Sequence, residues 1–185
     1  MKFFALYFRV DLQQKPFWFD DFRSKYDESY DLHVTLIQPR YIEEAEENLL
    51  RFKVEKFLRE NKLSEEDKEL VFDKFVCERE LDGKYTCMLI NQSNNSLISF
   101  QKRLREDLKR FDKYVDNVTE QYEIDFRPHI TIGRNIADKS LEEVESYFKS
   151  GYATRALVDE LVLPIVENNS IEEAQNPKNL TVFKI

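Results

Sequence analysis

The two tetrapeptides His33-Val34-Thr35-Leu36 and His129-Ile130-Thr131-Ile132 contain both histidines of this 185-residue chain. In each, a threonine follows the histidine by two positions, and aliphatic residues occupy the other two places. Side chains alternate between the faces of a β-strand, so the imidazole and the hydroxyl share one face, about 7 Å apart, while the aliphatic pair packs behind them. We therefore expect two strands that present four polar groups to one cleft.

These residue types are suited to acid–base chemistry at phosphorus. Histidine has an ordinary pKa near 6.5, so one imidazole can be neutral and accept a proton while the other is protonated and donates one. Threonine hydroxyls can donate hydrogen bonds to phosphate oxygens whose charge grows in the transition state. Such chemistry needs no metal or other cofactor, and no ligand motif of the usual spacing is present.

Two other interpretations of the histidines remain open from the residues alone. Threonine is a common strand residue, and a histidine on a half-buried strand is often structural. Alternatively, the two imidazoles could hold a metal ion between them, although each strand then contributes one nitrogen ligand with nothing soft or acidic beside it.

The repeated motif, with one copy in each half of the chain, resembles the 2H phosphoesterase superfamily, and within it the 2′-5′ RNA ligase or RNA 2′,3′-cyclic phosphodiesterase family. Pro128 precedes the second motif and Arg134 follows it, which is similar to a sequence frequent in that family. After the first motif the chain departs from the family pattern, with Ile37-Gln38-Pro39-Arg40 and a long stretch over 41–69. The departure concerns the substrate more than the chemistry.

This resemblance implies a fold and a set of roles. The fold has two pseudo-symmetric lobes of antiparallel or mixed sheet, with flanking helices around a central cleft. His33 and His129 are then the acid–base pair, Thr35 and Thr131 bind the scissile phosphate, and Arg134 adds positive charge. Arg40 and Arg127 either join the phosphate site or pair with carboxylates.

The periodicity of apolar residues indicates an α+β protein with one domain over residues 1–185. Alternation and turn residues predict strands at 3–10, 31–37, 70–81, 84–91, 121–126, 129–134, 154–166 and 180–185. Three- and four-residue spacing predicts helices at 16–26, 43–60, 95–111 and 140–149.

Composition limits the classes of partner. The formal charge of −8 and the pI near 5.0 argue against coating of duplex DNA. No apolar run approaches the roughly 20 residues of a membrane span, and the apolar start of the chain is too short for a signal peptide. We expect a cytoplasmic protein without membrane contact, a monomer by default.

The two cysteines, Cys77 and Cys87, flank a predicted turn at Asp82-Gly83. A two-residue turn places their sulfurs on opposite faces of the hairpin, whereas a three-residue bulged turn places them opposite each other. Without a secretory signal, we expect two reduced thiols.

The function predicted first is hydrolysis of 2′,3′-cyclic phosphates on an RNA end or a small nucleotide. The alternatives are a 2′,5′-phosphodiesterase acting on oligoadenylate or cyclic oligonucleotide signals, a 2′-5′ RNA ligase, and a module that binds RNA ends without turnover. Turnover that depends on both histidines distinguishes the enzymes from the binding module.

Overall fold

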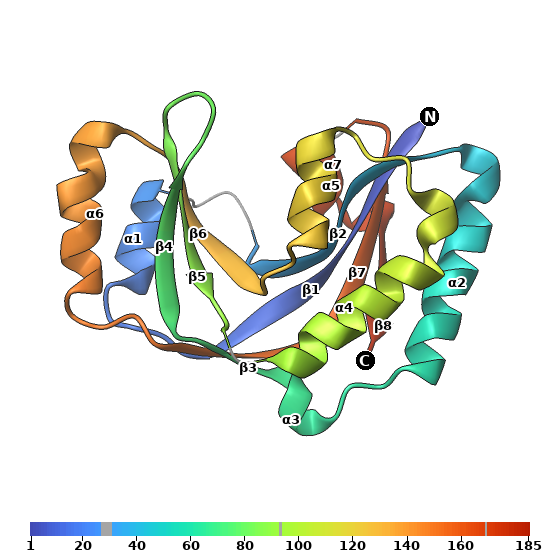
Figure 1. Cartoon of the computed structure of the whole chain (residues 1–185), viewed down its shortest axis with the longest axis horizontal. Coiled ribbons are helices and arrows are strands. Elements are labelled where there is room, and N and C mark those ends of the chain that lie inside the picture. Colours follow the sequence, from blue (N-terminus) through green and yellow to red (C-terminus); the bar gives the residue numbers. More distant parts are fainter. Residues whose placement is uncertain (27–30, 93, 169) are drawn as a thin grey trace.

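The computed structural model describes residues 1–26, 31–92, 94–168 and 170–185, which form two antiparallel sheets with flanking helices (Figure 1). The predicted α+β class is therefore confirmed. The larger sheet has the order β2-β1-β7-β3, with β8 paired to another part of β7. Its strands are β1 (Lys2–Gln14), β2 (His33–Ile42), β3 (Glu69–Phe72), β7 (Thr154–Val166) and β8 (Leu180–Lys184). The smaller sheet has the order β4-β5-β6, formed by β4 (Lys74–Arg79), β5 (Tyr85–Ile90) and β6 (His129–Ile136).

Helices α1 and α6 cover the outer side of the smaller sheet and α2 and α4 that of the larger one, whereas α5 and α7 stand on the side of the larger sheet that faces the smaller one (Figure 1). Their bounds are α1 (Phe19–Tyr26), α2 (Glu47–Glu60), α3 (Glu65–Lys68), α4 (Asn95–Asp107), α5 (Asn117–Ile124), α6 (Leu141–Phe148) and α7 (Ile171–Gln175). Short 3-10 turns cover Glu44–Glu46, Lys109–Phe111, Asp138–Ser140 and Pro177–Asn179. In the parts of the chain described here, no helix combines the length and apolar character needed to cross a bilayer.

The core of the larger lobe is built on β1, whose side chains alternate between buried and half-buried positions. Phe4, Leu6 and Phe8 are at most 1% exposed. The Phe8 ring packs 5.7 Å from that of Phe100 on α4, which in turn lies 5.1 Å from Phe57 on α2. Because truncating a buried ring to alanine typically costs about 3–5 kcal/mol, this layer holds α2 and α4 firmly on the sheet.

An aromatic cluster holds the smaller lobe together. The ring centroids of Trp18 and Phe148 lie 4.6 Å apart, and those of Phe22 and Phe148 lie 5.4 Å apart. Phe22 also approaches the backbone of β6 so closely that a Cβ on Gly133 would sit 2.9 Å from its Cε1 atom. Glycine is therefore required at position 133, where α1 packs against the strand that carries the second motif.

Two strand predictions are wrong. The predicted strand 70–81 is two strands, because after Asp73 the chain passes from the larger sheet to the smaller one as β3 ends and β4 begins. The predicted strand 121–126 is instead the end of helix α5 and the turn after it. Asp116 starts this helix, since its carboxylate accepts a 2.7 Å hydrogen bond from the Thr119 amide, an N-cap that outweighs the alternating apolar residues.

The expectation of two reduced thiols is also wrong in this structure. Gly83 adopts a φ of 82°, and its amide donates to the Glu80 carbonyl at 3.0 Å, while the Glu80 amide donates to Lys84. The hairpin therefore has the longer, bulged turn. It places Cys77 directly opposite Cys87, and the two form a disulfide.

Candidate active site

The four motif side chains line one cavity between the two sheets, as the alternation of the motif strands predicted. His33 and Thr35 on β2, and His129 and Thr131 on β6, are half-buried and face a space of about 240 Å³. The aliphatic residues between and after them face the cores and are at most 1% exposed; they are Val34, Leu36, Ile130 and Ile132. The fold thus brings together two motifs that are distant in the sequence.

The backbone orients both imidazoles in the same way. Nδ1 of His33 lies 2.7 Å from the carbonyl oxygen of Asp31, and Nδ1 of His129 lies 2.8 Å from that of Arg127. A carbonyl oxygen only accepts, so each Nδ1 carries the proton and donates it. In the neutral ring, Nε2 then keeps its lone pair. Each histidine is therefore fixed in the tautomer whose Nε2 can accept a proton or, once protonated, donate it.

The site lowers the pKa of both histidines. Burial is the main cause for His33, and the positive charges of Arg134 and His129 act in the same direction. Burial also dominates at His129, where Arg127 lowers the pKa further and Glu78 opposes it. Both shifts favour the neutral ring, and a bound phosphate anion would favour the protonated form of an imidazole beside it.

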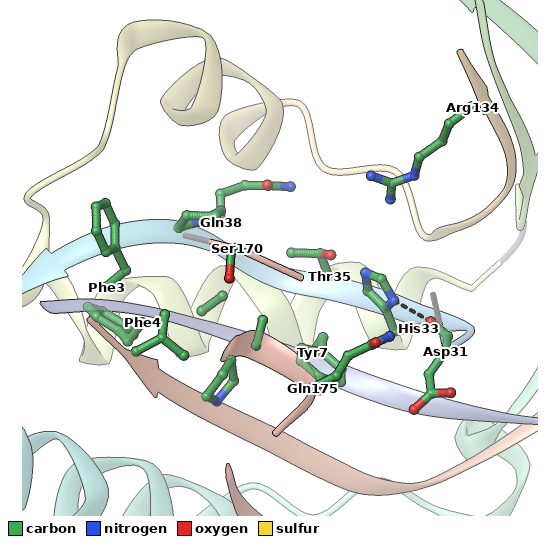
Figure 2. A pocket seen from close by; sticks show the side chains of 15 residues that line it. Phe3, Phe4, Tyr7, Asp31, His33, Thr35, Gln38, Arg134, Ser170 and Gln175 are labelled. Carbon is green, nitrogen blue, oxygen red and sulfur yellow. Dashed lines mark hydrogen bonds between the residues drawn. The ribbon is translucent and has the colours of Figure 1, made fainter. Parts of the chain in front are cut away.

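Arg134 reaches this site from β6. It lines the cavity with the four motif residues, and Figure 2 shows its guanidinium directed across the cavity towards Thr35 and His33. Its charge also enters the electrostatic environment of both histidines. Its role at a phosphate site stays a prediction.

The other two candidate arginines pair with carboxylates. Arg40 is fully buried, and its guanidinium forms ion pairs with Asp112 at 2.7 Å and with Glu123. It lines neither of the cavities beside the histidines, so of the two alternatives the pairing with carboxylates is the one that the structure shows. Arg127 lines the cavity but donates to Glu78 at 2.9 Å.

A second cavity, of about 300 Å³, adjoins the first, and Figure 2 shows the side chains that line it. His33, Thr35, Gln38 and Arg134 line both. We call the second space the α7 cavity, because Ser170, Ala174 and Gln175 at helix α7 form one wall of it. Its remaining walls come from Phe3, Phe4, Ala5, Tyr7, Asp31, Pro39, Pro164 and Val166.

The first space is called the α5 cavity, because residues at and after helix α5 close it. Besides the motif residues it is lined by Glu78, Glu80, Thr86, Met88, Ile90, Tyr122, Asp125, Phe126 and Arg127. Among the residues that close the two cavities at helices α5 and α7, the sequence had named Arg127 as a candidate. Helix α7 has five residues and no regular apolar spacing, so no signal in the sequence marked it.

A metal centre finds no set of ligands here. In residues 1–26, 31–92, 94–168 and 170–185, no three side chains of His, Cys, Asp or Glu are grouped so that they could hold an ion. The expected independence from metal stays a prediction that needs an assay.

Comparisons with known proteins bear on this site. A family model described as the 2′-5′ RNA ligase superfamily matches residues 10–169. Kluyveromyces marxianus Usb1 has a similar structure, with a TM-score of 0.53, 9% identity and coverage of 99% of this chain and 98% of that one. The structure of that protein with uridine monophosphate has a TM-score of 0.52 and 10% identity, with coverage of 99% of this chain and 98% of that one.

E. coli LigT complexed with 3′-AMP gives a TM-score of 0.47 and 14% identity, with coverage of 100% of this chain and 95% of that one. A comparison with curated proteins found no match. At these identities, the likeness to Usb1 shows a common fold.

Proposed function

Because the chain belongs to the 2′-5′ RNA ligase superfamily, we propose that it is a metal-independent phosphodiesterase that hydrolyses 2′,3′-cyclic phosphates on RNA ends or small nucleotides. The observation that carries this proposal is the matched pair of imidazoles. Two strands from different sheets place them at one cavity, and each has its Nδ1 fixed by a backbone carbonyl. A pair of histidines with a purely structural role would not need both rings held in the tautomer that leaves Nε2 able to accept a proton.

The reaction uses one imidazole as a base and the other as an acid. The neutral Nε2 of one histidine takes a proton from water while the water oxygen forms a bond to phosphorus. The bond from phosphorus to one ribose oxygen breaks, and the protonated Nε2 of the second histidine gives that oxygen its proton. The product is a nucleoside phosphomonoester, and the two histidines have exchanged protonation states.

The remaining motif groups stabilise the charge that develops on phosphate. Thr35 and Thr131 place one hydroxyl on each side of the cavity, where both can donate to nonbridging oxygens. Arg134 adds positive charge from the β6 side. Donors fixed before the reaction starts stabilise the transition state without a cost of reorganisation.

The test is hydrolysis of a short RNA ending in a 2′,3′-cyclic phosphate, with EDTA present. We expect turnover by the wild type and a loss of at least 100-fold in kcat/KM for His33→Asn and for His129→Asn, since asparagine keeps a polar side chain but cannot titrate. Thr181→Ala on β8, which lines neither cavity, is the matched control for handling and folding. Thermal unfolding should be closely similar in all four proteins.

Each outcome decides between readings of the site. Activity that requires added divalent metal contradicts the two-histidine mechanism. Turnover of 2′,5′-linked or cyclic oligonucleotides, with none of the cyclic phosphate, keeps the mechanism and changes the substrate class. Ligation of suitable RNA ends would show the same machinery running in reverse. Binding of RNA ends with no turnover of any of these substrates makes the protein a binding module.

A further inference from the structure

The two cavities that meet at the histidines differ in chemical character. The walls that belong only to the α7 cavity are apolar or uncharged apart from Asp31. The walls that belong only to the α5 cavity include three carboxylates, from Glu78, Glu80 and Asp125. A substrate centred on the histidines therefore meets unlike surroundings on its two sides.

The α7 cavity has the features of a nucleobase site. Tyr7 contributes an aromatic ring whose centroid lies 5.0 Å from that of His33, and Figure 2 shows Gln175 beside these two residues. The amides of Gln38 and Gln175 and the hydroxyl of Ser170 add hydrogen-bonding groups around an apolar floor. A nucleobase combines a flat face that stacks on aromatic rings with an edge of donors and acceptors.

Asp31, the acidic residue that lines the α7 cavity, is compatible with a nucleobase site. The carbonyl of Asp31 accepts the hydrogen bond from His33, and in Figure 2 its carboxylate points away from Thr35 and Arg134. Arg134 lines both cavities, so its positive charge lies at the phosphate position between them.

The α5 cavity is unfavourable for a second phosphate. Arg127 is the cation that belongs to this cavity alone, and it donates to Glu78 at 2.9 Å. Glu80 and Asp125 add two exposed carboxylates to the same walls. A phosphate on this side faces like charges at short range, and repulsion of this kind decreases as salt screens it.

We propose that the substrate binds across the two histidines in one orientation only, an inference that rests on the proposed function. The base of the nucleotide that carries the scissile phosphate occupies the α7 cavity, and the α5 cavity accepts water or an uncharged nucleoside but no further phosphate. The enzyme therefore acts on a phosphate at the end of a chain, or on a dinucleotide, and discriminates against a strand that continues through the α5 cavity.

The first arm of the test removes the base. Adenosine 2′,3′-cyclic phosphate should be hydrolysed with a kcat/KM at least 10-fold above that of methyl riboside 2′,3′-cyclic phosphate. Gln175→Ala should reduce that preference at least 3-fold, while Gln13→Ala, an exposed glutamine at the far end of β1, should not change it. Equal rates for the two substrates in the wild type overturn the base site.

The second arm adds a phosphate on the leaving side. A 2′,5′-linked diadenosine should be cleaved at least 10-fold better than the same dinucleotide with a 3′-phosphate on its leaving nucleoside. The double variant Glu80→Gln/Asp125→Asn should reduce this ratio at least 5-fold, and high salt should reduce it in the wild type. A ratio near one in the wild type, or an unchanged ratio in the variant, contradicts the direction that we propose.

A binding arm separates failure of this inference from failure of the proposed function. If the wild type turns over none of these substrates, the function is wrong, and calorimetry then compares adenosine 3′-monophosphate with ribose 3-phosphate. Binding at least 10-fold tighter with the base, a difference that Gln175→Ala reduces at least 3-fold, still supports the base site. Equal binding of the two phosphates overturns it, whatever the protein catalyses.

Discussion

Replacement of Arg40 by leucine tests the contacts that hold β2 against helix α5. The guanidinium is fully buried and pairs with Glu123, whose side chain is also fully buried. One Glu123 carboxylate oxygen accepts a hydrogen bond from the backbone N–H of Gln38 at 2.9 Å, and the other accepts one from the Tyr114 hydroxyl at 3.0 Å. Arg40→Leu removes the cation and leaves this carboxylate inside the protein.

The contacts that remain set the size of the effect. Breaking a buried ion pair by removing one partner costs about 3–5 kcal/mol. Glu123 keeps its two hydrogen bonds, and Arg105 lies 3.4 Å away with a side chain that is 31% exposed. We therefore expect a loss near the lower end, about 3 kcal/mol of unfolding free energy. With a urea slope of about 2 kcal/mol per molar, the midpoint should fall by about 1.5 M.

Urea unfolding followed by circular dichroism measures this loss. Lys15→Ala is the control, because its pair with Asp20 is exposed on both sides, at 44% and 71%, and such pairs contribute less than about 1 kcal/mol. The double variant Arg40→Leu/Glu123→Leu should be more stable than Arg40→Leu alone, since it buries no unpaired charge. A loss below about 1 kcal/mol for Arg40→Leu would refute the reasoning.

Two further predictions concern the active site. Because burial lowers the pKa of both His33 and His129 in the free protein, the form with one ring protonated and one neutral is most populated below pH 6.5. The pH profile of kcat/KM for cyclic phosphate hydrolysis should therefore be a bell with its maximum below pH 6.5; a maximum above pH 7.5 contradicts it. Thr35→Ala and Thr131→Ala should each lower kcat about 10- to 1000-fold, as loss of a fixed donor does. Thr181→Ala serves as control, and an unchanged rate in either motif variant removes that threonine from the site.

The motif strands could be predicted because local sequence decides them. The alternation in each tetrapeptide fixes which side chains face the core. In both strands the aliphatic residues are buried, and the histidine and threonine are half-buried at the cavity. The chain after Thr35 was harder to interpret, because Arg40 has no local feature that separates a phosphate ligand from a buried ion pair. Its partners Asp112 and Glu123 come from a distant part of the chain, and the end of helix α5, where Glu123 lies, had been predicted as part of a strand over 121–126.

The two imidazoles are oriented in the same way by the backbone, so the bound substrate must decide which is the acid and which is the base. Each Nδ1 donates to the carbonyl two residues before it, so the motifs alone do not distinguish acid from base. The cavities do distinguish them, since His33 lines both, whereas His129 lines the α5 cavity only. With the nucleoside in the α7 cavity, water approaches through the α5 cavity beside His129, and the departing ribose oxygen lies on the side of His33. The proposed direction of the substrate thereby makes His129 the base and His33 the acid for a cyclic phosphate, an asymmetry that arises from the walls around two equivalent motifs.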